Sequence, residues 1–350
     1  MSVMKKILVV RNDKIGDFML SWPSFAMLKS SIPNCHITAL VPKYTEALAK
    51  LCPWIDNVII DPTKDAASDE KKKCLKIIRD QNFDASINLF STTYNALLVW
   101  NAGIPYRIAP ATKLAQIFYS KRIKQNRSLS IKPEYQYNLD LIRAFLKDIK
   151  QPIVEPKGPY LQFSLATLKQ QKNKLSTLLN LDLSKPWLFV HAGSGGSANN
   201  LSIEQYAKLL MGIGGYKEII LTAGPGERSK AAQLKALIKL NGGNAVLYDK
   251  NEGLGDFACS IACADLFIAG STGPLHIAAA LDVPTVGFFP AKRSSTSLRW
   301  MPLNSSGRHL AFSPSEVGCS GTRADDMSQI KIDQVLFQLK SWMKLHGFLY

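Results

Sequence analysis

The sequence lacks any long apolar run. Its 350 residues have a mean hydropathy of −0.02, and no apolar stretch reaches the roughly 18 residues that a membrane-spanning helix needs. The first apolar run, residues 7–10, is too short for the core of a signal peptide, and no small-residue cleavage site follows it. These absences argue against an integral membrane protein and predict a cytoplasmic one.

Cysteine is scarce and irregularly spaced. The chain has six cysteines and no C-x-x-C motif; the one close pair, Cys259 and Cys263, has helical i,i+4 spacing. A structural zinc site needs a second close pair of ligands. We therefore expect no metal and no cofactor, and we expect these residues to be buried free thiols: Cys35, Cys52, Cys74, Cys259, Cys263 and Cys319.

Acidic residues are outnumbered. Lys and Arg total 43 against 27 Asp and Glu, a formal net charge of +16. Such an excess favours a polyanionic partner: nucleic acid, an anionic membrane face or a phosphorylated substrate. Between Arg107 and Lys132 all the charged residues are basic, which fits an anion-binding surface or an ordinary solvated face. No nucleic-acid-binding motif is present, so we expect no nucleic-acid partner.

Alternating strand and helix patterns fill both halves of the chain. Hydrophobic residues make up 46% of the sequence, enough for a sizeable core. Short β-branched runs and amphipathic stretches predict strands at 6–10, 36–41, 57–60 and 85–89, with helices at 18–31, 44–52 and 68–81. After a proline- and glycine-containing linker at 149–160, helix 165–179 leads into strands at 187–190, 218–222, 245–247, 266–269 and 285–289, with helices at 202–211 and 277–281. This order predicts two α/β domains with doubly wound parallel sheets, whose ligands bind beyond the carboxyl ends of the strands.

Three predicted strands of the second half run into small-residue turns, at 191–197, 223–227 and 270–276. Small residues at a helix start let a phosphate approach the backbone N–H groups, so we expect a diphosphate site there. Neither a Walker A motif nor a full G-x-G-x-x-G is present. Glu227 fits either a ribose-binding acid or a helix N-terminal acid, and His276 either a phosphate contact or a packing residue.

In the first half, Asp17 follows Gly16 where a turn enters a helix. A carboxylate at this place suits a general base that accepts a proton from an attacking hydroxyl. It equally suits a helix N-cap, and the neighbouring Asp13 competes for either role.

Taken together, these motifs resemble glycosyltransferase family 9, the ADP-heptose:lipopolysaccharide heptosyltransferases. The resemblance rests on the blocks ILVVRNDKIGDFMLSWP at 7–23, HAGS at 191–194 and AGSTGPLHIAAALDVPTVGFF at 269–289. Shorter similarities lie at 52–58, 223–227 and 299–302, so the matching blocks span nearly the whole chain.

The resemblance implies a GT-B fold, in which two Rossmann-like doubly wound parallel-sheet domains face each other across a cleft. Residues 1–155 would bind the acceptor and residues 156–330 the nucleotide sugar, and a helix in 331–350 would pack back toward the N-terminal domain. It also implies an inverting, metal-independent transfer of a heptose from ADP-heptose to a lipopolysaccharide core acceptor. The basic charge of the chain and this type of acceptor predict peripheral contact at the cytoplasmic face of the inner membrane.

The same resemblance assigns expected roles to individual residues. Asp17 would be the general base. Donor-binding residues would be Ser194, Gly195, Glu227, Ser271, Thr272, Gly273, Pro274 and His276. Acceptor-binding residues would be Lys14, Arg107, Lys121 and Arg122.

The sequence departs from the family pattern at two donor positions. The stretch 197–202, which includes Asn199, lacks the usual Lys or Arg, and Ser271 stands where an Asp is usual. A transferase with a different nucleotide-sugar donor and a non-catalytic nucleotide-sugar-binding homologue are therefore alternatives. A Rossmann oxidoreductase is another, but its first turn would carry G-x-G-x-x-G, and here Gly16 stands alone.

Overall fold

The structure is a computed structural model that describes residues 4–111, 114–196, 199–215, 217–314 and 325–348. The chain divides between Tyr160 and Leu161 into two compact units. The first unit consists of β1 (Lys6–Val10), α1 (Ile15–Met19), α2 (Trp22–Ser31), β2 (His36–Pro42), η1 (Lys43–Thr45), α3 (Glu46–Leu51), β3 (Asn57–Asp61), α4 (Ser68–Asp80), β4 (Ala85–Asn88), α5 (Thr93–Asn101), β5 (Tyr106–Pro110), η2 (Leu114–Phe118), β6 (Lys121–Ile123), η3 (Arg127–Leu129) and α6 (Glu134–Asp148).

The second unit repeats this plan after an opening helix. It consists of α7 (Leu165–Leu179), β7 (Trp187–His191), α8 (Ile203–Ile213), β8 (Glu218–Thr222), α9 (Arg228–Leu240), β9 (Val246–Tyr248), α10 (Leu254–Ile261), β10 (Leu266–Gly270), α11 (Gly273–Ala280), β11 (Thr285–Phe288), β12 (His309–Phe312), η5 (Met327–Gln329) and α12 (Ile332–His346).

Each unit contains one six-stranded sheet, and the two sheets have the same order. The first runs β3-β2-β1-β4-β5-β6 and the second β9-β8-β7-β10-β11-β12, with parallel pairing at every ladder of the described residues. This is the doubly wound order, in which the winding reverses at the central strand pair. The predicted fold class is confirmed.

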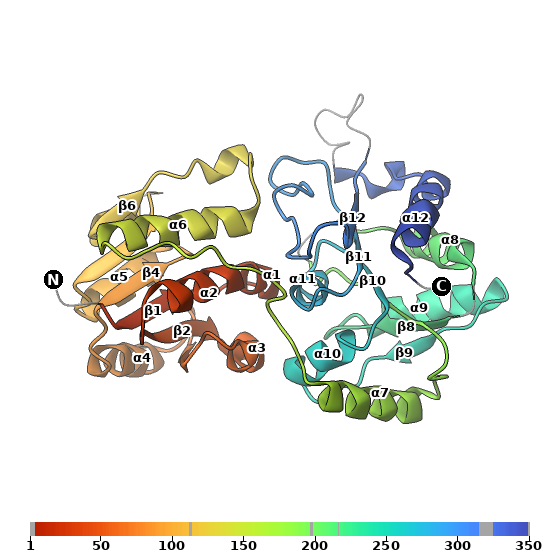
Figure 1. Ribbon diagram of the computed structural model, residues 1–350, viewed down its shortest axis with the longest axis horizontal. Helices are drawn as coiled ribbons and strands as arrows, with labels where there is room; N and C mark the ends of the chain where they lie inside the picture. The colour runs from red at the N-terminus through yellow and green to blue at the C-terminus, as the bar shows by residue number, and fades with distance from the viewer. Residues whose placement is uncertain (1–3, 112–113, 197–198, 216, 315–324, 349–350) are drawn as a thin grey trace. The chain divides into compact units, whose positions relative to one another are not determined.

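Helices cover both faces of each sheet (Figure 1). In the first unit, α2 packs beside α6 on one face, and the other face carries a core formed by β1 and β2 with α4 and α5. In the second unit, Leu188 and Val190 of β7 point into a core shared with α8, α9 and α12. The central strands are buried on both faces, as their continuous apolar runs predict.

The topology fixes where the sites of each unit can form. Ligands bind such sheets at the carboxyl edge, beside the switch point between the two central strands. In the first unit this point lies at the ends of β1 and β4, and in the second at the ends of β7 and β10. The turn that contains Asp17 follows β1, and the turns before α8 and α11 follow β7 and β10.

The expected helix over 18–31 forms instead as two helices, α1 and α2, with Leu20 and Ser21 between them. Pro23 is the second residue of α2. Proline lacks the N–H that a continuous helix would bond to the preceding turn, but it is well tolerated in a first turn. The chain therefore begins a new helix at Trp22.

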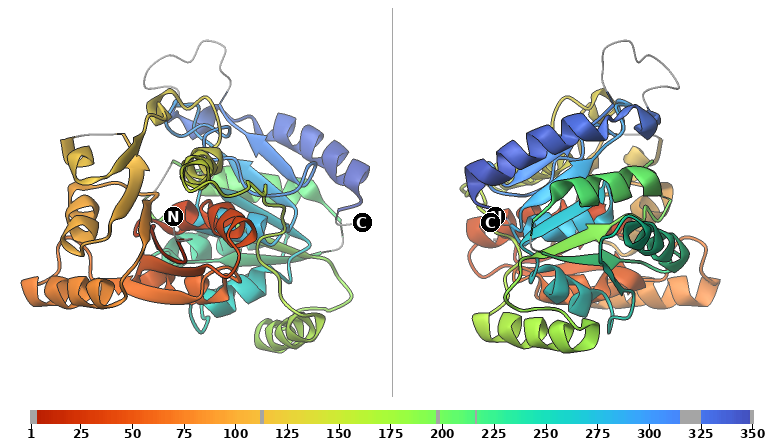
Figure 2. Two further views of the ribbon diagram at one scale, coloured as in Figure 1. Left: turned by 60° about the vertical axis from the view of Figure 1, so that its left-hand side comes forward. Right: turned by 90° about the vertical axis from the view of Figure 1, so that its right-hand side faces the viewer.

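The C-terminal helix belongs to the second unit. The expectation that it also packs toward the N-terminal domain stays a prediction. In the structure its buried side chains, among them Val335, Leu339 and Met343, belong to the core of the second unit, and α12 lies beside α8 (Figure 2). The apolar stripe of α12 is thereby buried within its own unit.

The structure bears on two expectations that were drawn from composition, one about membrane-spanning helices and one about cysteines. No helix among them is long and apolar enough to cross a membrane. The five cysteines within the described ranges are free and buried; the sixth, Cys319, lies outside the described residues.

Candidate active site

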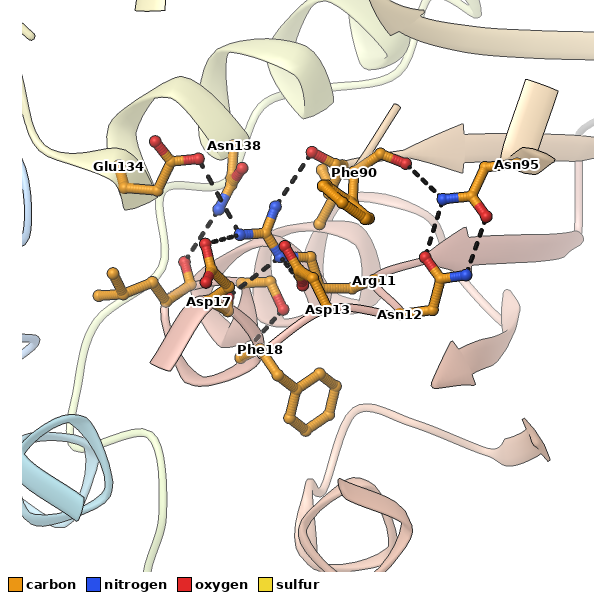
Figure 3. A network of polar contacts seen from close by, with 12 residues as sticks. Arg11, Asn12, Asp13, Asp17, Phe18, Phe90, Asn95, Glu134 and Asn138 are labelled. Atoms are coloured by element: carbon orange, nitrogen blue, oxygen red, sulfur yellow. Dashed lines mark hydrogen bonds and ion pairs between the residues drawn. The ribbon is translucent and has the colours of Figure 1, made fainter. Parts of the chain in front are cut away.

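A buried arginine organises the carboxyl edge of the first sheet. Arg11, directly after β1, is only 2% exposed. Its Nη1 donates to the carbonyl of Leu89 at the end of β4 over 3.0 Å, and its Nε donates to the carbonyl of Asp17 over 3.2 Å. The guanidinium thus bridges the two central strands at the switch point (Figure 3).

Three carboxylates surround this guanidinium. Nη2 of Arg11 donates to Oδ1 of Asp17 over 2.6 Å, its Nε lies 3.0 Å from Oδ1 of Asp13, and Nη2 lies 4.0 Å from Oε1 of Glu134. Burial alone would lower the pKa of Arg11, but these carboxylates outweigh it and keep the pKa raised. Arg11 is therefore a permanent cation within an anionic cluster.

Asp17 is the more accessible of the two aspartates in this turn. It lies in the first turn of α1, whose N-cap residue is Lys14, so the N-cap interpretation is wrong. Its side chain is 18% exposed, against 12% for Asp13. Arg11 holds the carboxylate, and the side chain is partly exposed.

Asp13 is in a different electrostatic state. Burial raises its pKa to about 7, against the opposing effect of Arg11 and with a further rise from the charge of Asp17. The two aspartates thus share one arginine, but burial favours the protonated form of Asp13 near neutral pH.

This difference predicts a pH-dependent stability. Between about pH 4 and 7 native Asp13 keeps a proton that the unfolded chain has released, so its contribution to the free energy of unfolding falls as pH rises. The Asp13→Asn variant should therefore have a higher melting temperature than the wild type at pH 8. Below pH 4 the two proteins should have the same melting temperature. Thermal unfolding between pH 4 and 8 measures this, and a variant that is equally or less stable at pH 8 contradicts it.

In the second unit, Glu227 gathers the backbone of two small-residue turns. Its Oε1 accepts from the N–H of Gly195 over 2.7 Å, and its Oε2 accepts from the N–H of Gly224 over 3.0 Å. Burial works against the charge of Glu227, yet His191 and the N–H groups of Gly195, Gly224 and Ser194 hold its pKa below the usual range. Two N–H groups expected for the diphosphate, those of Ser194 and Gly195, therefore bind Glu227.

His191 contacts the carboxylate of Glu227. Its Nε2 lies 3.3 Å from Oε2 of Glu227, and its Nδ1 lies 3.0 Å from Oγ1 of Thr222. Burial lowers the pKa of His191, and the charge of Glu227 opposes this effect. A proton on Nε2 lets the ring donate to Glu227, while the Thr222 hydroxyl donates to the Val190 carbonyl over 3.3 Å.

The second turn of interest, after β10, leads into α11. Thr272 is the N-cap residue, but its side chain makes no cap hydrogen bond, and Pro274 is the second helical residue. Oγ1 of Thr272 and Nδ1 of His276 are both buried without a hydrogen-bond partner. Burial, with His309 nearby, lowers the pKa of His276 to about 3. The helix start thus combines uncapped N–H groups with two polar side chains, both of them neutral.

Ser271 and Gly273 flank Thr272 in this turn. The backbone N–H of Ser271 continues the ladder to the Phe288 carbonyl over 3.0 Å, and both residues are partly exposed. The expected donor residues therefore lie in two groups on neighbouring turns: Ser194, Gly195 and Glu227, which bind one another, and Ser271, Thr272, Gly273, Pro274 and His276.

One of the four expected acceptor residues has an internal role. Arg107 in β5 donates through Nε to the carbonyl of Phe118 over 2.8 Å and through Nη1 to the carbonyls of Ile104 and Pro105. Its guanidinium thereby holds the chain before β6 against β5, so acceptor binding by Arg107 would compete with these contacts.

The other three expected acceptor residues are more accessible. Lys121 forms an ion pair with Asp148 over 2.8 Å and is 42% exposed. Lys14, at the N-cap of α1, and Arg122 in β6 are exposed. Lys14 lies nearest in sequence to Asp17, and its role in acceptor binding remains a prediction, as does that of Lys121 and Arg122.

Three residues of these clusters were not predicted from the sequence as site residues: Arg11, Glu134 and His191. Arg11 directly follows β1 and His191 ends β7, so both lie at a switch point. This position is the signal by which the sequence could have identified them. Glu134 begins α6, far along the chain, and nothing local marks it. In the part of the chain that the structure describes, no group of three His, Cys, Asp or Glu side chains is placed to hold a metal ion.

Comparison with known proteins identifies the family of this chain. Residues 72–322 match the model of glycosyltransferase family 9 (heptosyltransferase). A Haemophilus influenzae protein named "Putative glycosyltransferase" is 49% identical over 344 residues, 97% of each chain. Lipopolysaccharide heptosyltransferase 2 of Salmonella typhimurium is 23% identical over 81% of this chain and 82% of its own.

A solved structure shows the same architecture. The Escherichia coli ADP-heptose lipopolysaccharide heptosyltransferase II superposes with a TM-score of 0.77 at 19% identity, covering 98% of this chain and 99% of that one. The two doubly wound sheets are thus those of the GT-B fold. The chain belongs to glycosyltransferase family 9, the heptosyltransferase family, and is a glycosyltransferase.

Proposed function

We propose that this glycosyltransferase moves a heptose from ADP-heptose to a lipopolysaccharide core acceptor, with inversion at the anomeric carbon and without a metal ion. The observation that carries the proposal is the uncapped start of α11, where the buried Thr272 hydroxyl has no partner. Relatives named as lipopolysaccharide heptosyltransferases support the choice of donor and acceptor class.

The leaving nucleotide diphosphate gains negative charge as the glycosidic bond to it breaks. The start of α11 offers N–H groups and the positive end of the helix dipole, and Thr272 offers a hydroxyl. Such fixed dipoles stabilise the developing charge without reorganising. We propose that they do the work that a metal ion does in other glycosyltransferases, and that Glu227 binds the ribose hydroxyls.

Asp17 is the proposed general base. It accepts the proton of the acceptor hydroxyl as the hydroxyl oxygen attacks the anomeric carbon from the face opposite the diphosphate. One displacement of this kind inverts the configuration. Arg11 holds the Asp17 carboxylate in place, and the Asp17 side chain is 18% exposed.

The acceptor carries phosphate and carboxylate groups, and we propose that the basic side chains of the first unit bind them. Lys14 and Arg122 are the first candidates, because both are exposed. The same charges would favour an anionic membrane surface. Vesicles with and without anionic lipid, compared at low salt, test that contact.

A different nucleotide sugar is the second candidate function, and two asparagines favour it. Where the family pattern has a cation, Nδ2 of Asn199 donates to the carbonyl of Asp325, and Nδ2 of Asn200 donates to the carbonyls of Ala192 and Gly193. These side-chain amides hold the turn by hydrogen bonds, and because they are neutral they place no positive charge beside the donor.

A donor screen separates the two candidates. ADP-heptose and a panel of UDP-, GDP- and dTDP-sugars are offered with lipid A-core acceptors truncated at successive sugars, and nucleotide release is measured. Release that requires both ADP-heptose and an acceptor is the expected result. Release from another donor favours the second candidate, and nucleotide binding without turnover favours a binding protein.

Thr272→Val tests the donor site within this screen. The change keeps the shape of the side chain and removes the hydroxyl, so we expect kcat/KM for the donor to fall about tenfold, the effect of one hydrogen bond to a charged group. Thr38→Val is the matched control, because Oγ1 of Thr38 is also buried without a partner but lies in the middle of β2. Equal kinetics for the two variants would contradict the role of Thr272.

A further inference from the structure

The contacts around the proposed base lead one step further. We infer that Arg11 is a positioning residue for Asp17: it orients the carboxylate and keeps it ionised for the transfer reaction. This inference rests on the proposed role of Asp17 as the base. It assigns to Arg11 no contact with either substrate.

The hydrogen bonds of Arg11 explain why it orients Asp17 instead of binding an anionic ligand. Nη1 is taken by the Leu89 carbonyl, Nε by the Asp17 carbonyl, and Nη2 by the Asp17 carboxylate (Figure 3). The side chain is 2% exposed. A guanidinium fixed at three nitrogens to β4 and α1 holds one carboxylate oxygen at a defined place.

Glu134 and Arg127 form a second layer behind Arg11. Oε1 of Glu134 lies 4.0 Å from Nη2 of Arg11 and accepts from Nη1 of Arg127 over 2.6 Å. The amide of Asn138, one turn further along α6, donates to the carbonyl of Leu20 at the end of α1 over 3.3 Å. Helix α6 is thereby attached both to the arginine and to the helix that carries Asp17.

The charge of Arg11 sets the protonation of its neighbour. The charges of Asp13, Asp17 and Glu134 act on Arg11, and those of Asp13 and Asp17 act on Tyr44 from η1. Arg11 touches the Asp17 carboxylate directly. A nearby positive charge typically lowers a carboxyl pKa by about 1–3 units. Loss of Arg11 should therefore raise the pKa of Asp17, and the acidic limb of the rate profile should move to higher pH.

The test follows the Asp17 carboxyl in the full-length protein by NMR with ¹³C-labelled aspartate, and its signal is assigned by its loss in Asp17→Asn. In Arg11→Gln we expect the midpoint of this titration to rise by about 1–3 pH units. With the donor and acceptor that the screen selects, kcat should fall at least tenfold and the acidic limb of kcat/KM should move by the same amount. The KM for the donor should change less than twofold.

Arg11→Lys covers the case in which Arg11→Gln does not fold. Lysine keeps the charge but cannot reach the Leu89 carbonyl and the Asp17 carboxylate with separate, fixed nitrogens. We expect a midpoint near that of the wild type and a kcat reduced at least fivefold. Wild-type kcat in Arg11→Lys overturns the positioning role.

The outcomes separate the inference from the function on which it rests. If Asp17→Asn is inactive and folded Arg11→Gln titrates and turns over like the wild type, the inference fails and the base remains. If Asp17→Asn retains wild-type turnover, the proposed base fails. The NMR midpoint then still decides whether Arg11 controls the ionisation of Asp17.

Discussion

Asp17→Asn should lower transfer by about 10²–10⁴-fold, the usual range for removal of a general base. Asparagine keeps the size of the side chain and its hydrogen bond from Arg11, but its amide cannot accept the acceptor's proton. The loss should appear in kcat, because the proton moves only during the transfer. Nucleotide release with saturating donor and acceptor measures it.

Asp56→Asn is the matched control. Asp56 also belongs to the first unit and pairs with a cation, Lys29, over 2.6 Å. It precedes β3, however, and therefore lies at the amino edge of the sheet, opposite the proposed site. This variant should turn over at close to the wild-type rate. A reduction in turnover of less than tenfold in Asp17→Asn would exclude Asp17 as the base. Calorimetry should show that Asp17→Asn binds the nucleotide as the wild type does.

Gly193→Ala should weaken nucleotide binding by about 10–100-fold. A Cβ at this position would lie 2.2 Å from the Oε2 of Glu227, a distance that no side chain tolerates. The carboxylate must move, and it then loses the N–H groups of Gly195 and Gly224. Hydrogen bonds to a charged group contribute about 1.5–3 kcal/mol each. Calorimetric titration with the nucleotide that the donor screen selects measures the change.

Gly224→Ala provides a graded comparison. Its Cβ would meet the same oxygen of Glu227 at 3.0 Å, so a small movement of the carboxylate suffices and we expect a weaker effect. Glu227→Gln completes the series, because it keeps the shape and removes the charge. Unchanged nucleotide affinity in a folded Gly193→Ala protein would show that Glu227 has no part in donor binding.

Much of the fold follows from local patterns in the sequence. The run 6–10 and the helix 165–179 form with the predicted bounds. The region between 89 and 134 was not assigned, although it contains α5, β5 and β6. Strand β6 is only three residues long and begins with Lys121 and Arg122. A basic edge strand of this kind carries little periodicity, and it forms because β5 offers a partner.

The helix over 134–148 was not predicted either, although its sequence is amphipathic. The segment before it is rich in basic residues. Those residues fit an anion-binding surface or an ordinary solvated face. The structure pairs two of them with acidic residues of α6: Arg127 pairs with Glu134, and Lys132 pairs with Asp140. Composition reports the excess of charge, but the partners of each charge come from distant parts of the chain.

The sequence by itself determined the two-unit α/β plan, the family, and the positions of Asp17, Glu227 and Thr272 at strand-to-helix turns. These follow from short-range periodicity and from local motifs. The tertiary structure decided which distant groups stand beside them: Leu89 and Glu134 beside Arg11, His191 beside Glu227, and α12 on α8. The reason is physical, because parallel strands bring the ends of β1 and β4, or of β7 and β8, together only when the sheet forms. The protonation and orientation of the site residues depend on those long-range contacts.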